Sequence, residues 1–377
     1  MSPNDEQVRA AREDADNIER RRDRPRPRAR LLCGGLAVTS RIIVADALDG
    51  LAQLPDGSVR CCVTSPPYWG LRDYGITGQL GLESTPQEYV ERMVAVFREV
   101  RRVLQDDGTL WLNLGDSYAA GGRGGGMAGE RGEKQRSNAG ALLGPKEPPP
   151  GLKPKDLVGI PWRVAFALQA DGWWLRSDII WAKPNPMPES VTDRPTKAHE
   201  YLFLLSKSQR YFYDAKAIAE PAAGDTCPDP RLIDGFVPKS DNGKHAGMPQ
   251  SAALRKQDAL AKATYTGFNG RWDAKDGAHH QTRNARSVWT IPTSPFPEAH
   301  FATFPEALPE RCVRAGSAEG DTVLDPFHGA GTVGVVCKRL NRAFVGIELN
   351  PDYAAMAERR IRRSPAHQLD LPLMEAP

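Results

Sequence analysis

The chain has 377 residues, of which 40% are hydrophobic, and its formal net charge is +3. This length predicts either two domains or one enlarged domain with a sizeable core. The nearly balanced charge does not by itself demand a nucleic-acid partner, although it can hide a basic face. The six cysteines form no C-x-x-C pair and no histidine cluster completes a zinc spacing, so no metal site is expected. No secretory signal or long apolar span occurs, so we expect a protein of the reducing cytoplasm without a membrane partner.

The first 38 residues are rich in arginine and proline, and we expect them to form a disordered basic tail. An arm that contacts phosphates is the alternative. The following stretch, 39–215, alternates apolar strands with amphipathic helices. Strands are expected at 41–45, 59–64, 109–114, 176–181 and 201–206, and helices at 86–104 and 156–170. The residues 119–152 are rich in glycine and proline and form an insertion, either a mobile loop near the site or an inert one.

Residues 216–290 show no clear periodicity and are polar, with arginine, lysine and aromatic residues interleaved. Periodic segments return in 291–362. Helices are expected there at 305–315, 335–340 and 352–362, and strands at 321–324 and 343–347. We expect residues 363–377 to form a C-terminal tail. The alternation of strands and helices on both sides of 216–290 predicts an α/β fold.

A rigid polar turn, Ser65-Pro66-Pro67-Tyr68, follows the expected strand 59–64. Proline fixes φ and has no N–H, so the turn is stiff and carbonyl oxygens around Ser65 and Pro66 can accept hydrogen bonds. Such acceptors beside an aromatic face suit a planar amino group, and nucleic-acid bases carry such groups. An enzyme reaches one by extruding the base and stacking it on an aromatic side chain. A proline-rich turn that merely closes a strand is the alternative.

A glycine-rich turn occurs late in the chain. Gly329, Gly331 and Gly334 have the spacing G-x-G-x-x-G between an expected strand and an expected helix. Glu348 ends the next strand, where an acidic residue grips ribose hydroxyls in dinucleotide folds. Asp325 at the strand tip would repel a phosphate group and suits a cationic cofactor group instead.

Together the two motifs resemble those of the amino-group DNA methyltransferases that use S-adenosyl-L-methionine. Ser65-Pro66-Pro67-Tyr68 is similar to the family's catalytic motif, (D/N/S)-P-P-(Y/F/W), and Phe327-His328-Gly329-Ala330-Gly331 is similar to its cofactor motif, F-x-G-x-G. The catalytic motif comes first in the chain, as in the permuted beta type. The resemblance implies a doubly wound, Rossmann-like sheet with permuted motif order and a target-recognition insertion at 216–290.

The resemblance also implies which residues form the site. The catalytic residues are Ser65, Pro66, Pro67 and Tyr68. The segment 178–186 resembles the base-pocket motif, and its candidate residues are Trp181, Lys183 and Asn185. The cofactor-binding residues are Asp46, Thr303, Phe304, Asp325, Phe327, Gly329, Gly331, Thr332 and Glu348. The implied cofactor is S-adenosyl-L-methionine, the implied partner is double-stranded DNA, and a cognate restriction endonuclease is a candidate partner in a bacterial or phage-encoded system.

The chemistry separates the possible target atoms. Ser65 and the Pro66 carbonyl would accept the hydrogens of an exocyclic amine, and Tyr68 would stack on the base. Methylation of a ring carbon needs a cysteine after proline, and no Pro-Cys dipeptide occurs. In the family, serine in the first motif position is more often found with cytosine N4 and aspartate with adenine N6. We therefore expect a cytosine-N4 enzyme, with adenine N6 as the alternative.

Three other functions compete with this one. A nicotinamide-dependent dehydrogenase would use the glycine turn but leaves Ser65 to Tyr68 unexplained. A non-catalytic DNA-binding protein on this scaffold would need broken cofactor contacts, whereas Asp325, Gly329, Gly331 and Glu348 are all present in the sequence. Methylation of a protein glutamine uses Asn-Pro-Pro-Tyr in a related family, and Ser65 argues against it.

Overall fold

The structure is a computed structural model, and it describes residues 40–71, 75–76, 78–119, 148–221, 282–294 and 304–365. The expected basic tail, most of the insertion and most of the recognition region lie outside the described residues. The chain divides into two compact units, one formed by Met1–Asp214 with Arg286–Pro377 and the other by Ala215–Ala285.

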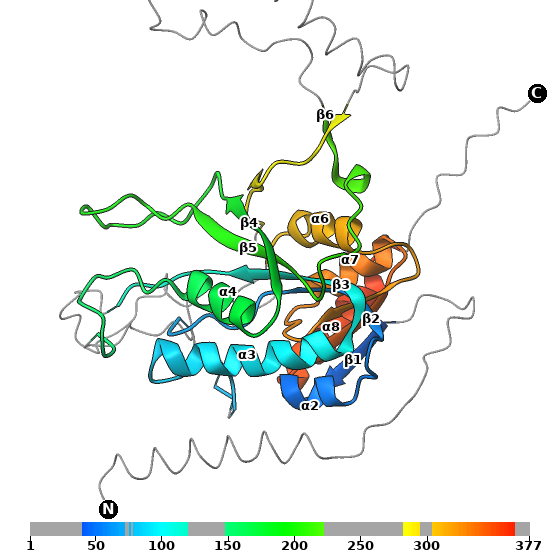
Figure 1. The fold of residues 1–377 in the computed structure, drawn as a ribbon, viewed down its shortest axis with the longest axis horizontal. Coiled ribbons are helices and arrows are strands. Elements are labelled where there is room, and N and C mark those ends of the chain that lie inside the picture. The colour runs from blue at the N-terminus through cyan, green and yellow to red at the C-terminus, as the bar shows by residue number, and fades with distance from the viewer. Residues whose placement is uncertain are drawn as a thin grey trace, which may run out of the picture. The chain divides into compact units, whose positions relative to one another are not determined.

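The first unit is built on an eight-stranded sheet with the order β1-β10-β9-β2-β3-β5-β4-β8 (Figure 1). Its strands are β1 (Ser40–Val44), β2 (Val59–Thr64), β3 (Leu104–Leu114), β4 (Trp174–Ala182), β5 (His199–Ser206), β8 (Val288–Thr290), β9 (Thr322–Asp325) and β10 (Ala343–Glu348). All neighbouring pairs are parallel except those of β5, which is antiparallel to both β3 and β4. The predicted α/β class with a mostly parallel sheet is confirmed.

Two groups of helices cover the two faces of this sheet (Figure 1). One group comprises α2 (Ala47–Ala52), α3 (Pro86–Val103) and α4 (Ile160–Ala170), and the other comprises α6 (Ala307–Gly316), α7 (Thr332–Arg339) and α8 (Pro351–Arg363). Side chains along each strand point alternately to the two faces of the sheet, so each strand packs against both helix layers. On β10, Ile347 packs with the α2–α4 layer, whereas Phe344 lies against Gly334 of α7. Because a strand buried on both faces is apolar throughout, these strands read as continuous hydrophobic runs.

The longest helix shows why the sequence patterns were readable. Thr85 caps the first turn of α3 by accepting a hydrogen bond from the Glu88 N–H, and Pro86 occupies the start of the helix, where its missing N–H costs nothing. Apolar residues then recur every three or four positions and are buried, among them Met93, Phe97 and Val100.

Several elements differ from the expected ones. The helix α4 begins at Ile160 and not at 156, because Gly159 adopts a left-handed conformation (φ 77°) that sets the helix start. The strand β3 begins at Leu104, five residues earlier than expected. The helix α2 and the strand β8 were not predicted. β8 pairs with β4 in the main sheet, although it lies inside the interval 216–290 expected for target recognition.

The second unit is described only at its ends. It contains the short 3-10 helix η2 (Lys216–Ile218) and the strands β6 (Glu220–Pro221) and β7 (Thr282–Arg283), which pair antiparallel. The Arg283 Nε lies 3.5 Å from the Glu220 Oε2 across this pair. The remaining residues of the expected recognition region are outside the described ranges.

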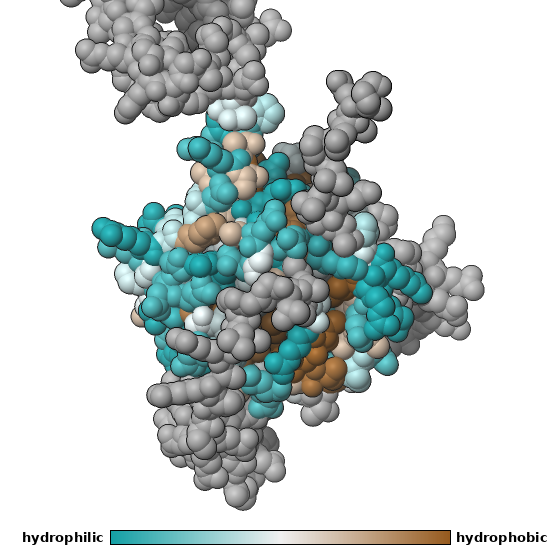
Figure 2. All heavy atoms as spheres, turned by 90° about the vertical axis from the view of Figure 1, so that its right-hand side faces the viewer, coloured by the Kyte–Doolittle hydropathy of each residue, from teal (hydrophilic) through white to brown (hydrophobic). Residues whose placement is uncertain are grey.

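Hydrophilic residues cover most of the described surface on the side that Figure 2 presents, and apolar residues gather there in smaller patches. Among the residues with a described position, no helix has the length and hydropathy needed to cross a membrane. Within the same residues, no group of three histidine, cysteine or acidic side chains could hold a metal ion.

Candidate active site

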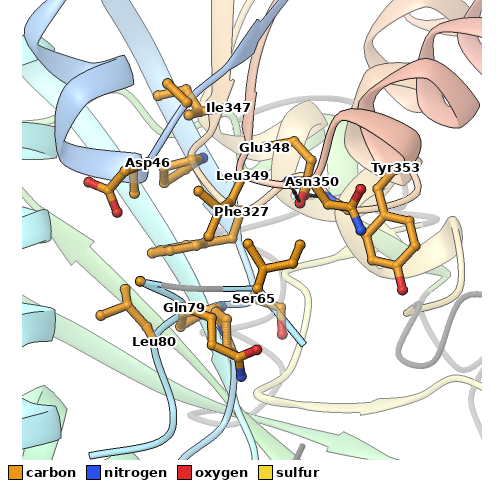
Figure 3. Close-up of a pocket in the computed structure, with 18 of the residues that line it drawn as sticks. Asp46, Ser65, Gln79, Leu80, Phe327, Ile347, Glu348, Leu349, Asn350 and Tyr353 are labelled. Carbon is orange, nitrogen blue, oxygen red and sulfur yellow. Dashed lines mark hydrogen bonds between the residues drawn. The ribbon is translucent and has the colours of Figure 1, made fainter. Parts of the chain in front are cut away.

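A pocket lies where the carboxyl ends of β1, β2, β9 and β10 meet. Carboxyl ends of parallel strands form the usual ligand-binding edge of an open α/β sheet. The pocket is lined by Ala45, Asp46, Ala47, Ser65, Pro66, Pro67, Tyr68, Leu71, Ile76, Gly78, Gln79, Leu80, Pro326, Phe327, Gly329, Ile347, Glu348, Leu349, Asn350 and Tyr353 (Figure 3). The early proline turn and the late glycine turn therefore open onto one cavity, although more than 250 residues separate them in sequence.

Acidic side chains form one part of the pocket wall. In Figure 3, Asp46 and Glu348 lie above the Phe327 side chain, and Ser65 lies below it with Gln79 and Leu80. Both Glu348 oxygens accept backbone N–H groups, from Gly329 at 2.9 Å and from Asn350 at 2.9 Å. Burial raises the pKa of Glu348. Asp46 caps α2 by accepting a hydrogen bond from the Leu48 N–H at 2.9 Å, so both carboxylates have fixed positions.

Asp325 occupies a different place from the one expected for it. Its Oδ1 accepts hydrogen bonds from the Thr64 hydroxyl at 2.7 Å and from the Phe327 N–H at 3.1 Å. The side chain is buried and is not part of the pocket wall. Burial raises the pKa of Asp325 to about 7. The carboxyl group therefore holds the turn after β9 against the end of β2.

Three of the other predicted cofactor residues also lie away from the pocket wall. Gly331 adopts φ 76°, and a Cβ there would lie 2.8 Å from the Ala357 Cβ, so this glycine permits close packing of α7 on α8. The Thr332 hydroxyl accepts a hydrogen bond from Arg360 at 2.9 Å and is buried. Phe304 is half-buried and does not line the pocket. Thr303 lies outside the described residues.

The turn Ser65-Pro66-Pro67-Tyr68 is held from several sides. The Tyr89 hydroxyl of α3 donates to the Pro67 carbonyl at 2.9 Å, and the Trp69 indole donates to the Glu83 carbonyl at 2.9 Å. The Tyr68 ring lies directly over Gly115, where an added Cβ would come within 2.5 Å of its Cε2 atom. The backbone of the turn and the plane of the aromatic ring are thus fixed by the surrounding core.

A hydrogen-bonded cluster links the turn Ser65–Tyr68 to β3 and β5. The Ser65 hydroxyl donates to the Tyr68 hydroxyl at 3.2 Å, and Tyr68 donates to Glu200 Oε2 at 2.7 Å. The Asn113 Nδ2 lies 2.8 Å from both the Tyr68 hydroxyl and Glu200 Oε2, and 3.4 Å from Ser65 Oγ. The Lys183 ammonium donates to Glu200 Oε1. Burial and the neighbouring Glu200 raise the pKa of Tyr68 well above its usual range.

Of the three predicted base-pocket residues, only Lys183 reaches this cluster. Trp181 is buried, and its indole N–H donates to the Ile291 carbonyl at 2.8 Å. The Lys183 Nζ lies 4.3 Å from the centroid of the Trp181 ring. Asn185 is bound to the backbone of Thr293, whose N–H donates to Asn185 Oδ1 at 3.0 Å. Trp181 and Asn185 therefore support the strand edge.

Sequence reasoning missed Asn113 and Glu200, which lie on neighbouring strands of the sheet. Each had a weak signal, because a polar residue near the end of an otherwise apolar buried strand needs a partner. Glu200 stands at the start of the apolar run Leu202 to Leu205, and Asn113 interrupts the apolar run of β3. Gln79, Asn350 and Tyr353 line the pocket and had no motif to mark them.

Comparisons with known proteins identify the family. A family model described as DNA methylase of the N6/N4 type matches residues 59–359. The Type II methyltransferase M.XycI of Xanthomonas campestris pv. cyanopsidis is 48% identical over 323 residues, which cover 86% of this chain and 88% of that protein. The Type II methyltransferase M.SmaI of Serratia marcescens is 47% identical over 324 residues, covering 86% of this chain and 91% of that protein.

Solved structures share the fold. The putative DNA modification methylase TTHA0409 from Thermus thermophilus, in complex with S-adenosyl-L-methionine, has a TM-score of 0.50 and 24% identity, and the match covers 86% of this chain and 94% of that one. The cytosine-N4-specific PvuII DNA methyltransferase has a TM-score of 0.52 and 19% identity, with coverages of 86% and 87%.

The chain belongs to the amino-group DNA methylase family, as its motifs predicted. It is a DNA amino-methyltransferase, and the cofactor of this class is S-adenosyl-L-methionine. Because the chain belongs to this family, the alternative that the glycine turn binds the nicotinamide cofactor of a dehydrogenase is rejected.

Proposed function

We propose that this protein transfers a methyl group from S-adenosyl-L-methionine to the N4 amino group of a cytosine extruded from double-stranded DNA. The observation that carries the proposal is the shared cavity, in which Ser65 of the catalytic turn faces a wall formed by Phe327, Gly329 and Glu348. Methyl transfer requires the cofactor and the base amine to lie side by side, and this is possible only where the cofactor-binding wall and the Ser65 turn border one cavity. The serine in the first motif position favours N4 of cytosine over N6 of adenine.

The pocket residues fit the cofactor by charge and shape. Glu348 presents a carboxylate whose orientation is fixed by two backbone N–H groups, which suits ribose hydroxyls. Asp46 adds a second acidic group, and Phe327, Ile347 and Leu80 provide apolar surface for a planar ring. Gly329, with φ 48°, turns the chain sharply beside Glu348. When bound there, S-adenosyl-L-methionine supplies an electrophilic methyl group on a positively charged sulfur.

The catalytic turn would prepare the amine for attack. The lone pair of an exocyclic amine is delocalised into the ring, so the amine is a poor nucleophile. Ser65 and the Pro66 carbonyl accept its hydrogens and favour a tetrahedral nitrogen, each acceptor contributing on the order of 2–4 kcal/mol. Tyr68 stacks on the extruded base, which contributes roughly 1–3 kcal/mol. Orientation of the amine toward the methyl group supplies the rest of the acceleration.

The proposal includes the biological setting. The relatives at 47–48% identity are named Type II methyltransferases, and we infer that this enzyme also protects DNA in a bacterial cytoplasm, with a cognate restriction endonuclease as partner. The region 216–290 is proposed to select the DNA sequence, because arginine, lysine and asparagine side chains can read phosphates and base edges.

Mass spectrometry of nucleosides tests the target atom. Duplex DNA is incubated with purified protein and a cofactor whose methyl group carries deuterium, then digested to nucleosides. We expect labelled N4-methylcytosine. Labelled N6-methyladenine would show that adenine is the target base. If genomic DNAs of low and high G·C content all yielded no labelled nucleoside, methyl transfer to DNA would be refuted.

A further inference from the structure

Three hydroxyl and carboxyl groups form a continuous hydrogen-bonded chain that starts at the pocket wall and ends beneath it. Ser65 Oγ donates to the Tyr68 hydroxyl at 3.2 Å, and the Tyr68 hydroxyl donates to Glu200 Oε2 at 2.7 Å. Ser65 and Tyr68 line the pocket, whereas Glu200 does not. The Glu200 side chain is 16% exposed and is paired with Lys183, itself 19% exposed.

The carboxylate fixes the direction of every hydrogen in this chain. An ionised carboxylate can only accept hydrogen bonds, so Tyr68 gives its single hydrogen to Glu200. The phenol oxygen must then accept, and Ser65 gives its hydrogen to it. Asn113 Nδ2 also donates toward the Tyr68 hydroxyl, at 2.8 Å, which reinforces the same direction. Asn113 Nδ2 also donates to Ser65 Oγ, at 3.4 Å. The second lone pair of Ser65 can accept the hydrogen of an incoming amine.

The reaction leaves a proton that Ser65 cannot keep. An amine that has accepted a methyl group carries a positive charge and one surplus proton. A neutral serine hydroxyl is too weak a base to hold it and can take it only by passing on its own hydrogen. An aspartate at the first motif position would place a carboxylate directly beside the amine. This chain has Ser65 at that position, and the carboxylate of Glu200 lies two hydrogen bonds away.

We propose that Glu200 is the positioning residue and final proton acceptor of a Ser65–Tyr68–Glu200 relay. This inference rests on the proposed function. The N–H bond of the methylated amine breaks as an O–H bond forms on Ser65, the Ser65 hydrogen passes to Tyr68, and the Tyr68 hydrogen passes to Glu200. The amine loses its positive charge, and Glu200 becomes a neutral acid that later releases the proton to solvent. Lys183 donates a hydrogen bond to Oε1 of Glu200 and so leaves Oε2 to accept from Tyr68.

Two variants break the relay at different links. Tyr68→Phe keeps the stacking ring and removes the hydroxyl, and Glu200→Gln keeps the side-chain shape and removes the carboxylate. Each is expected to lower the single-turnover rate of methyl transfer at least about 100-fold, the range of a lost proton-transfer group. Affinities for S-adenosyl-L-methionine and for DNA should stay within about threefold, which is under 1 kcal/mol. The double variant should be no slower than either single variant, because both interrupt one path.

Further measurements separate proton transfer from mere support of the ring. A fluorescent base analogue at the methylated position should report normal extrusion in both variants, and Glu200→Asp should recover part of the rate because it restores a carboxylate. Glu310→Gln, which removes a carboxylate bound by Arg314 and Arg339 outside the pocket, serves as the matched control and should not slow the reaction.

The relay is overturned if Tyr68→Phe transfers methyl groups within about threefold of the wild-type rate, or if extrusion fails in step with the rate. The Tyr68→Phe result decides the matter even if Glu200→Gln does not fold. The proposed function fails separately, when the wild-type protein forms a product other than N4-methylcytosine. The variant series then still tests the relay on that product.

Discussion

Gly115 keeps the Tyr68 ring in place by lacking a side chain. A Cβ at this position would come within 2.5 Å of Tyr68 Cε2 and 2.8 Å of Tyr68 Cδ2, too close for either atom to stay. We predict that Gly115→Ala rotates the ring and lowers methyl transfer at least about tenfold, the equivalent of 1.4 kcal/mol of lost stacking. Affinity for S-adenosyl-L-methionine, measured by calorimetry, should not change. In a Tyr68→Ala background the same substitution should have no further effect, and an equal second loss would contradict this explanation.

Asp325 makes the stability of the fold depend on pH. Its pKa is raised from 3.8 to about 7, mainly by burial. Between those values the folded state holds a proton that the unfolded state has released, so the free energy of unfolding falls as pH rises through this window, by at most about 1.4 kcal/mol per pH unit from this group. Above pH 7 the contribution is constant. Urea titrations of wild type and Asp325→Asn should show the wild-type advantage shrinking from pH 4.5 to pH 7. A difference that grows with pH would contradict the assignment.

Residue roles were predictable only where a local motif carried them. Ser65 to Tyr68 and Gly329 lie within short contiguous strings, and the structure brings them to one pocket. Asn113 and Glu200 come from two different strands, and their meeting depends on the antiparallel pairing of β3 with β5. No spacing within the sequence encodes that pairing.

At the scale of elements, Gly331 lies in the glycine turn before α7 and allows this turn to pack closely against α8. Its φ of 76° is left-handed, and a Cβ would lie 2.8 Å from the Ala357 Cβ of α8. We predict that Gly331→Ala lowers the free energy of unfolding by about 1–2 kcal/mol through backbone strain, and further through the clash. Urea unfolding measures the loss.

Gly320→Ala is the matched control for this substitution. Gly320 has φ 81° and no atom within 4 Å of an added Cβ, so that variant shows the strain alone. The loss for Gly331→Ala should exceed the loss for Gly320→Ala. Equal losses would show that contact with α8 does not matter, and a folded Gly331→Ala protein without cofactor affinity would restore a direct role in binding.

The elements themselves were mostly predictable, since burial imposes a period of 3.6 on helices and an apolar run on buried strands. The strand β2 matches the expected range, and α3 ends one residue earlier than expected. The six-residue helix α2 and the three-residue strand β8 are too short to show any period. The antiparallel direction of β5 was not predictable either. It depends on how the loop after β4 returns the chain to the sheet, and no periodic pattern in the sequence shows this.

At the scale of the whole molecule, the separate unit Ala215–Ala285 suggests that sequence choice and chemistry reside in different parts of the chain. We predict that exchanging 216–285 for the matching region of a relative with another target changes the methylated DNA sequence, without changing the modified base or the cofactor affinity. Long-read sequencing of DNA from cells that express the hybrid maps the site. An unchanged site would place recognition in the first unit.

The meeting of the two turns could be expected from the family's motif order but not from periodicity, because it depends on β9 lying between β10 and β2 in the sheet. The central claim is that this meeting point holds an extruded cytosine with its amine against Ser65.

A crystal structure of the protein with a non-reactive cofactor analogue and its DNA site tests this claim most directly. We predict that the N4 atom lies within hydrogen-bond distance of Ser65 Oγ and the Pro66 carbonyl, about 2.7–3.2 Å, and about 3–3.5 Å from the position of the transferred group. A base that remains stacked in the duplex, or one whose amine points away from Ser65, would contradict it.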